Sequence, residues 1–192
     1  GLIPPPPVPA GLRPARLHQV HGAGVVVLDT DPEPEEKADA LVSRSAGWVV
    51  AVLTADCAPV ALASPSGTFG AVHAGWRGLM AGIVEAAVAA VAVPAVVGGL
   101  GPTIGPCCYE FSQADLDRVA GRFGDEVRAT TRAGAPALDL PQAVRVALRE
   151  AGVELVVDHS SCTACGGGSF SYRARGDDAR QALYVWRDDG GR

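Results

Sequence analysis

The feature that most constrains the fold is a series of short apolar runs, each bounded by glycine, proline or acidic residues. Runs of this length and composition are typical of buried β-strands. They occupy residues 22–29, 38–43, 47–54, 61–64, 68–73, 95–101, 153–158 and 182–186. We therefore expect a structure built on sheets, with most of these strands inside the molecule.

Helical patterns lie between some of these runs, over residues 78–93, 112–123 and 141–152. Pro94 ends the first of them, because proline cannot continue a helix. Ser112 is a candidate N-cap for the second, with Asp115 three residues later, and Pro141 suits the first turn of the third. Since no repeat or internal linker is visible, the sequence predicts a single mixed α/β (α+β) domain.

Composition and charge exclude several classes of protein. With 192 residues and 48% hydrophobic content, the chain is long enough to bury a core. Its formal net charge of −5 argues against a nucleic-acid binder, which would normally present a basic face. The longest apolar segment, 79–97, contains Glu85 and Pro94, so we expect no membrane span. The proline-rich start predicts an extended arm over residues 1–17, followed by the domain at 18–192.

The cysteines favour a reduced, cytoplasmic protein. Five cysteines, an odd number, do not suggest a disulfide framework in a chain of this size. Cys107 and Cys108 are adjacent, and Cys162 and Cys165 form a CxxC pair. A CxxC pair is half of a zinc ribbon, and the sequence has no second half close to it. We therefore do not expect a zinc ribbon.

Three segments share one design, in which a side chain able to bind a metal stands at the end or entrance of a predicted strand. They are "HQVHG", "TADC" and "AVHAGWRG", which supply His21, Cys57 and His73. Three protein ligands with an open fourth position would match a catalytic zinc site rather than a structural one. The spacing does not prove that they meet, and each residue alone is also compatible with a packed side chain. His18 is an alternative to His21.

Five motifs in a fixed order make the chain resemble a known family. They are "HQVHG", "LTADCAPV", "AVHAGWRG", "GPTIGPCCYE" and "FSYRARGDDARQA", which extend from His18 to Gln181. In this order they are similar to the laccase-domain, or polyphenol oxidase, family. The resemblance implies an αββα layered sandwich with mixed sheets. It also implies a zinc-containing purine nucleoside phosphorylase with adenosine deaminase activity.

The same resemblance implies the metal ligands, which fall on His21, Cys57 and His73. Members of the family also carry a strand-rich region ahead of the first motif, whereas only seventeen residues precede His18 here. We therefore expect the contribution of that region to be missing or replaced in this chain.

Further residues are candidates for the chemistry. Arg77 is a candidate phosphate ligand, because it follows a tight turn into a helix, although it could equally pair with a surface carboxylate. Asp56 could move protons during catalysis, or it could be a buried hydrogen-bonding support. Tyr109 and Arg173 are candidate substrate contacts. Trp76 is expected to fill the core rather than to stack on a base.

The leading hypothesis is phosphorolysis of adenosine, inosine or guanosine, with methylthioadenosine as a further candidate, to free base and ribose 1-phosphate. Zinc-dependent deamination of adenosine accompanies it, so the expected partners are purine nucleosides and phosphate. One alternative is a copper polyphenol oxidase (laccase), since imidazole and thiolate also bind copper, although multicopper oxidation needs more than four histidines. A hydrolase using Cys57 and His73 and a non-catalytic metal-binding protein are the others.

Overall fold

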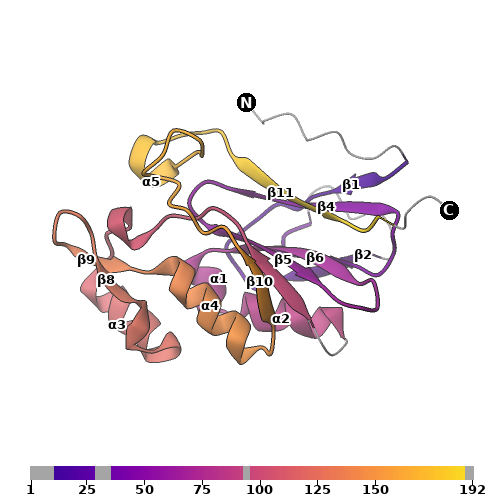
Figure 1. The fold of residues 1–192 in the computed structure, drawn as a ribbon, viewed down its shortest axis with the longest axis horizontal. Helices are drawn as coiled ribbons and strands as arrows, with labels where there is room; N and C mark the ends of the chain where they lie inside the picture. Colours follow the sequence, from indigo (N-terminus) through magenta and orange to yellow (C-terminus); the bar gives the residue numbers. More distant parts are fainter. Residues whose placement is uncertain (1–10, 29–35, 93–95, 189–192) are drawn as a thin grey trace.

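The fold is a mixed α/β domain in which two sheets pack against each other (Figure 1). It is described by a computed structural model over residues 11–28, 36–92 and 96–188. Helices cover the outer face of the larger sheet, as the contacts of α1, α2 and α4 with its strands show. The predicted layered, single-domain fold with mixed sheets is confirmed.

The larger sheet has six strands, and both parallel and antiparallel neighbours occur in it. Their spatial order is β10 (Glu154–Asp158), β7 (Val97–Leu100), β5 (Ala58–Ala63), β6 (Phe69–Ala74), β3 (Ala40–Ser43) and β2 (Val25–Leu28). All six coincide with predicted apolar runs, although β5 begins three residues before the predicted 61–64. The central strands β5, β6 and β3 are almost fully buried, because the second sheet covers one face and helices cover the other.

The smaller sheet consists of β1 (Arg13–Ala15), β4 (Trp48–Thr54) and β11 (Gln181–Trp186) in that order. Side chains alternate between the faces of a strand, and this alternation divides the core. Leu41, Phe69 and Ala71 of the larger sheet join Trp48 and Val50 between the two sheets. Their neighbours Ala40, Val42 and Val72 point the other way and pack under the helices.

The helices are α1 (Trp76–Met80), α2 (Ile83–Val91), α3 (Gln113–Phe123), α4 (Leu140–Glu150) and α5 (Tyr172–Arg175). Two 3₁₀ turns, Pro106–Cys108 and Asp125–Val127, and the hairpin β8 (Arg128–Thr130) and β9 (Pro136–Leu138) complete the described structure. None of the helices in these residues is long and apolar enough to cross a membrane.

Two of the three predicted helices form as expected. The Ser112 hydroxyl accepts a hydrogen bond from the backbone N–H of Asp115 at 3.1 Å, as predicted for an N-cap. Pro141 lies in the first turn of α4. The single helix predicted over 78–93 is wrong: the chain forms α1 and α2, and Gly82 between them has a φ of 87°, which interrupts a helix.

The predicted N-terminal arm lies partly outside the described residues, which begin at Gly11. Residues 13–15 of it form β1, which pairs in parallel with β4 over Trp48–Val50. This strand was not predicted from the sequence, because its pairing depends on a segment more than thirty residues away. Nor was α5, a single turn capped by Ser171.

Candidate metal centre

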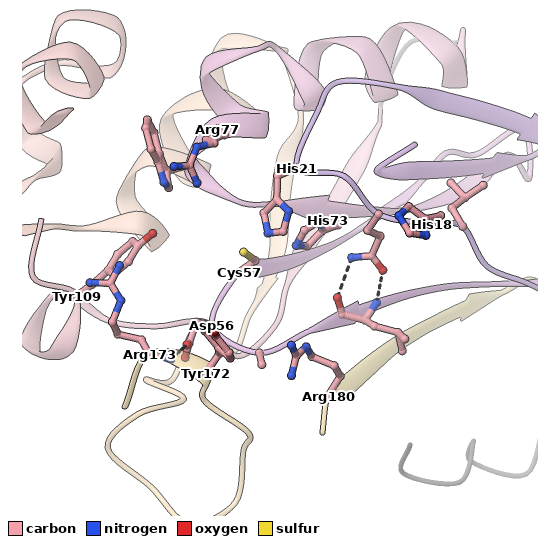
Figure 2. A pocket seen from close by; sticks show the side chains of 15 residues that line it. His18, His21, Asp56, Cys57, His73, Arg77, Tyr109, Tyr172, Arg173 and Arg180 are labelled. Atoms are coloured by element: carbon pink, nitrogen blue, oxygen red, sulfur yellow. Dashed lines mark hydrogen bonds between the residues drawn. The ribbon is translucent and has the colours of Figure 1, made fainter. Parts of the chain in front are cut away.

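His21, Cys57 and His73 come together at one end of the larger sheet (Figure 2). One ligand atom of each residue lies within 4.8 Å of those of the other two. The rings of His21 and His73 are 4.8 Å apart and nearly perpendicular, and both lie beside Cys57. His18 lies in the wall of the same pocket but is not part of this group. Of the two predicted alternatives, the structure therefore selects His21.

The backbone explains why these three side chains meet. Cys57 directly precedes β5, and His73 lies on β6, which pairs with β5 so that Pro59 is opposite His73. His21 lies in a loop and has a φ of 59°, a conformation that a non-glycine residue rarely adopts. Strain of this kind often accompanies functional sites. Gly75 leaves room between the ligands, since a Cβ there would lie 3.0 Å from the Cys57 sulfur and 3.2 Å from a His21 ring carbon.

Asp39 is a candidate site residue that was not predicted from the sequence. Its carboxylate is fully buried and accepts a hydrogen bond from Nδ1 of His73 at 2.7 Å. It also accepts backbone N–H groups of His21 at 2.9 Å and of Gly22 at 2.7 Å. One carboxylate therefore positions two of the three ligands. An acidic residue inside the apolar run 38–43 was the only sequence signal for it.

The contact with Asp39 also fixes which nitrogen of His73 is available. When Nδ1–H donates to the carboxylate, Nε2 is the nitrogen left to face Cys57 and, once it has lost its proton, to bind a metal. A carboxylate behind a metal-binding histidine is a common arrangement, and it orients the ring and raises its basicity. The buried pair therefore has the form expected of a metal ligand and its support.

The protonation of the cluster follows from its burial and its hydrogen bonds. Burial lowers the pKa of His73, but the hydrogen bonds to Asp39 and Cys57 outweigh it and raise this pKa to about 9. Burial raises the pKa of Cys57, yet its hydrogen bonds to His21 and His73 bring it down to about 7. The thiol is therefore already partly thiolate at neutral pH, which is the form that binds a metal.

Asp56 lies next to Cys57 but is engaged elsewhere. Its two carboxylate oxygens accept the hydroxyl of Thr163 and the backbone N–H of Arg173, both at 2.7 Å. Its φ of 91° is unusual for a residue other than glycine. Asp56 thus holds the loop around residue 163 and the start of α5 against the segment that carries Cys57. These contacts are those of a supporting residue.

The cluster opens into a pocket of about 620 Å³. In Figure 2, Arg77 and Tyr109 lie on one side of the ligands and His18 and Arg180 on the other. The guanidinium of Arg173 lies 4.9 Å from the centre of the Tyr109 ring and donates to the Glu110 carbonyl oxygen at 2.9 Å. The pocket is therefore wide enough for a small molecule and has several cationic groups in its wall.

Tyr109 and Trp76 belong both to the core and to the pocket. Burial raises the pKa of Tyr109 to about 12, with the nearby Cys57 adding to the effect, so its hydroxyl stays protonated at neutral pH. Trp76 packs edge-on against Phe111, with ring centres 5.3 Å apart, and the guanidinium of Arg77 lies over its ring. Trp76 packs against the core, as predicted, and it also lines the pocket.

Comparison with known proteins places this chain in a family. Residues 10–188 match the family model described as "Multi-copper polyphenol oxidoreductase laccase". The chain belongs to this laccase family. A purine nucleoside phosphorylase of Streptomyces coelicolor is 41% identical over 189 residues, which cover 93% of this chain and 78% of that protein. The purine nucleoside phosphorylase YfiH of Escherichia coli is 36% identical, with 91% and 74% covered.

Solved structures share the fold. Protein NMB0706 of Neisseria meningitidis has a TM-score of 0.80 at 32% identity, with 93% of this chain and 76% of that one covered. YlmD of Geobacillus stearothermophilus has a TM-score of 0.81 at 30% identity, with 92% and 74% covered. The predicted resemblance to this family is therefore confirmed.

Proposed function

We propose that this laccase-family protein is a metal-dependent purine nucleoside phosphorylase that also deaminates adenosine. The observation that carries the proposal is the group of His21, Cys57 and His73, backed by Asp39, at the wall of a pocket with cationic side chains. Relatives 36–41% identical to this chain are named purine nucleoside phosphorylases. We propose adenosine, inosine and guanosine as substrates, with phosphate as the co-substrate.

The donor set fits zinc. Two imidazoles and one thiolate leave a fourth position free, as in catalytic zinc sites. When bound, a metal of this kind supplies Lewis-acid chemistry and activates water for attack on the purine C6 during deamination. Copper fits the same three donors, but several copper ions would need more histidine ligands than the chain's total of four. Zinc is therefore our proposed metal, and the copper content of the protein is measured together with its zinc content.

Phosphate binding is assigned to Arg77. Its side chain is exposed on the pocket wall, and within the described part of the chain no carboxylate pairs with its guanidinium. A planar guanidinium can hold two phosphate oxygens at once. The alternative was that Arg77 forms an ion pair at the surface. Since the described residues provide no carboxylate partner for it, a role in anion binding is favoured.

Charge develops on both halves of the nucleoside as the bond between base and sugar breaks: positive on the sugar and negative on the leaving purine. The Tyr109 hydroxyl, protonated at neutral pH, is our candidate donor of a hydrogen bond to the departing base. Phosphate held by Arg77 then attacks the anomeric carbon. Arg173, over the Tyr109 ring, is proposed to fix that ring and to contact the substrate.

The role of Asp56 is proposed to be positioning. Both of its oxygens already accept hydrogen bonds, from Thr163 and from the Arg173 backbone. A carboxylate so engaged holds the loop that carries Arg173, whereas a general base needs a free oxygen facing the substrate.

One assay tests the proposal. Protein purified with measured zinc and copper content is incubated with inosine or adenosine, with and without phosphate. We expect phosphate-dependent release of the base, ribose 1-phosphate as co-product, and some conversion of adenosine to inosine. Cys57→Ala is expected to abolish both reactions and to lose the metal of this centre. If a metal-replete preparation releases no base from any purine nucleoside, the proposal is wrong.

A second candidate is a hydrolase with Cys57 as nucleophile. The observation in its favour is the order Cys57, His73, Asp39, in which a thiol of lowered pKa faces a histidine held by a carboxylate. Alkylation separates the two functions. A metal that occupies the thiolate protects Cys57 from iodoacetamide, so reactivity only after chelation favours the metal centre. Equal reactivity before and after chelation favours the hydrolase.

A further inference from the structure

A second group of side chains able to bind a metal lies outside the pocket, and it consists of four cysteines. Cys107 and Cys108 come from the 3₁₀ turn Pro106–Cys108, and Cys162 and Cys165 come from the loop after β10. Their sulfurs all lie within 4.8 Å of one another. The sequence has no second half close to the CxxC pair, but the fold brings two further cysteines to it, and Cys107 is 58 residues from Cys165.

The distances between the four sulfurs are compatible with a metal cage. The Cys165 sulfur is 3.3 Å from that of Cys107 and 3.5 Å from that of Cys108. Four sulfurs placed tetrahedrally at about 2.3 Å from a zinc ion lie about 3.8 Å apart. A disulfide needs a separation of about 2.05 Å and would use only two of the four. The observed separations are close to those of a tetrahedral site.

Backbone groups are also arranged around the sulfurs. The backbone N–H groups of Gly105 and Ala164 lie on the side of the Cys162 sulfur, where they favour its thiolate form. A Cβ on Gly105 would lie 3.2 Å from the Cys162 Cβ and 3.5 Å from two of the sulfurs, so glycine allows this close approach. N–H donors to a ligand sulfur orient it and stabilise the thiolate.

The two segments are held in place independently of the sulfurs. Thr103 forms a parallel bridge to Cys162: its N–H donates to the Ser161 carbonyl oxygen, and its own carbonyl oxygen accepts the N–H of Thr163, both at 3.1 Å. Arg175 donates to the carbonyl oxygens of Thr163 and Ala164, between the two cysteines of the CxxC pair. This places a positive charge beside a group that becomes negative when four thiolates bind one divalent ion.

We propose that Cys107, Cys108, Cys162 and Cys165 form a second metal centre that holds one zinc ion with four thiolate ligands. All four positions are then filled by protein, which makes the site structural. It ties together the two loops that shape the pocket, because Cys108 directly precedes Tyr109 and Cys162 directly precedes Thr163, the partner of Asp56. The centre is distinct from that of His21, Cys57 and His73.

Counting zinc tests the proposal without relying on activity. Cys57→Ala serves as the background, because it removes a ligand of the first centre and leaves all four cysteines of the second. Purified under reducing conditions and freed of loosely bound metal, this variant is expected to hold one zinc per chain. Adding Cys162→Ser and Cys165→Ser to this variant should abolish its zinc content. Zinc content unchanged by these two substitutions, or absent already from Cys57→Ala, would overturn the proposal.

Cobalt substitution gives a second readout that needs no change to the four cysteines. In Cys57→Ala, cobalt(II) is expected to give intense thiolate-to-cobalt absorption and the visible bands of a tetrahedral all-sulfur site. Circular dichroism before and after metal removal shows whether the fold persists. A disulfide in freshly prepared protein, found by mass spectrometry without reductant and accompanied by no cobalt bands, would also overturn the proposal.

Discussion

The buried carboxylate of Asp39 accepts Nδ1–H of His73 at 2.7 Å and also accepts the backbone N–H of His21 at 2.9 Å. A single side chain thereby sets the orientation of one metal ligand and the backbone position of another. The basicity of His73 rises for the same reason.

Asp39→Asn is expected to weaken metal binding at the first centre by about 10- to 100-fold, because the amide is a weaker acceptor and removes a charge behind His73. Phosphorolysis should fall with the occupancy of the metal. Competition with a chromophoric chelator measures the affinity. Glu154→Gln, which replaces an exposed carboxylate on β10, is the control and should leave the metal affinity unchanged. Equal affinities for the two variants would contradict the role of Asp39.

Metal affinity at the first centre should rise with pH. Binding requires the Cys57 thiolate and a free Nε2 on His73, whose pKa values are about 7 and about 9 in the metal-free protein. Below pH 7 these two groups both release a proton, so the affinity should rise by up to about 100-fold per pH unit. Between pH 7 and 9 only His73 does so, and the slope should fall to about tenfold per unit.

This profile is best measured in the Cys162→Ser/Cys165→Ser protein, which lacks two ligands of the second group. Titration with zinc in a competing chelator, from pH 6 to 9 at constant ionic strength, gives the slope of the logarithm of the metal affinity against pH. An affinity that does not change with pH over this range would contradict the protonation states inferred for Cys57 and His73.

Gly75→Ala tests the space between the ligands. The added Cβ would lie 3.0 Å from the Cys57 sulfur and 3.2 Å from a ring carbon of His21, so the ligands have to move apart. We expect at least a tenfold loss of metal affinity, on the scale of other changes that displace metal ligands. The φ of Gly75 is −80°, so alanine causes no backbone strain and the effect isolates the contact with the ligands.

Gly121→Ala is the matched control for this substitution. Gly121 lies in α3, and a Cβ there meets no atom within 4 Å. Alanine in a helix is expected to stabilise the protein by about 0.5–1 kcal/mol, without any change in metal affinity. Thermal unfolding and chelator competition on both variants separate stability from metal binding.

Arg77→Ala should raise the KM for phosphate by about 10- to 100-fold, as expected for the loss of a charge-assisted contact worth about 1.5–3 kcal/mol. The KM for the nucleoside should change much less. Arg118→Ala removes an exposed arginine of α3 that pairs with Asp115, and it serves as the control. A phosphate KM unchanged in Arg77→Ala would assign phosphate binding to another cation of the pocket.

The sequence by itself determined much of the element pattern. An apolar run bounded by turn residues forms a strand largely for local reasons, and β2, β3, β4, β6 and β7 lie where the runs predicted them. The cap at Ser112 depends on residues three positions apart and was predictable for the same reason. The five ordered motifs identified the family and singled out His21, Cys57 and His73, which do lie together.

Only the tertiary structure decided which polar residues act together. Asp39 is one of 21 acidic residues, and nothing local marks it as the partner of His73, which is reached through the pairing of β3 with β6. The four cysteines meet because the segments around Thr103 and Cys162 pair across the fold. Local propensity acts over a few residues, whereas these contacts depend on strand pairing between distant segments, which the packing of the whole core selects.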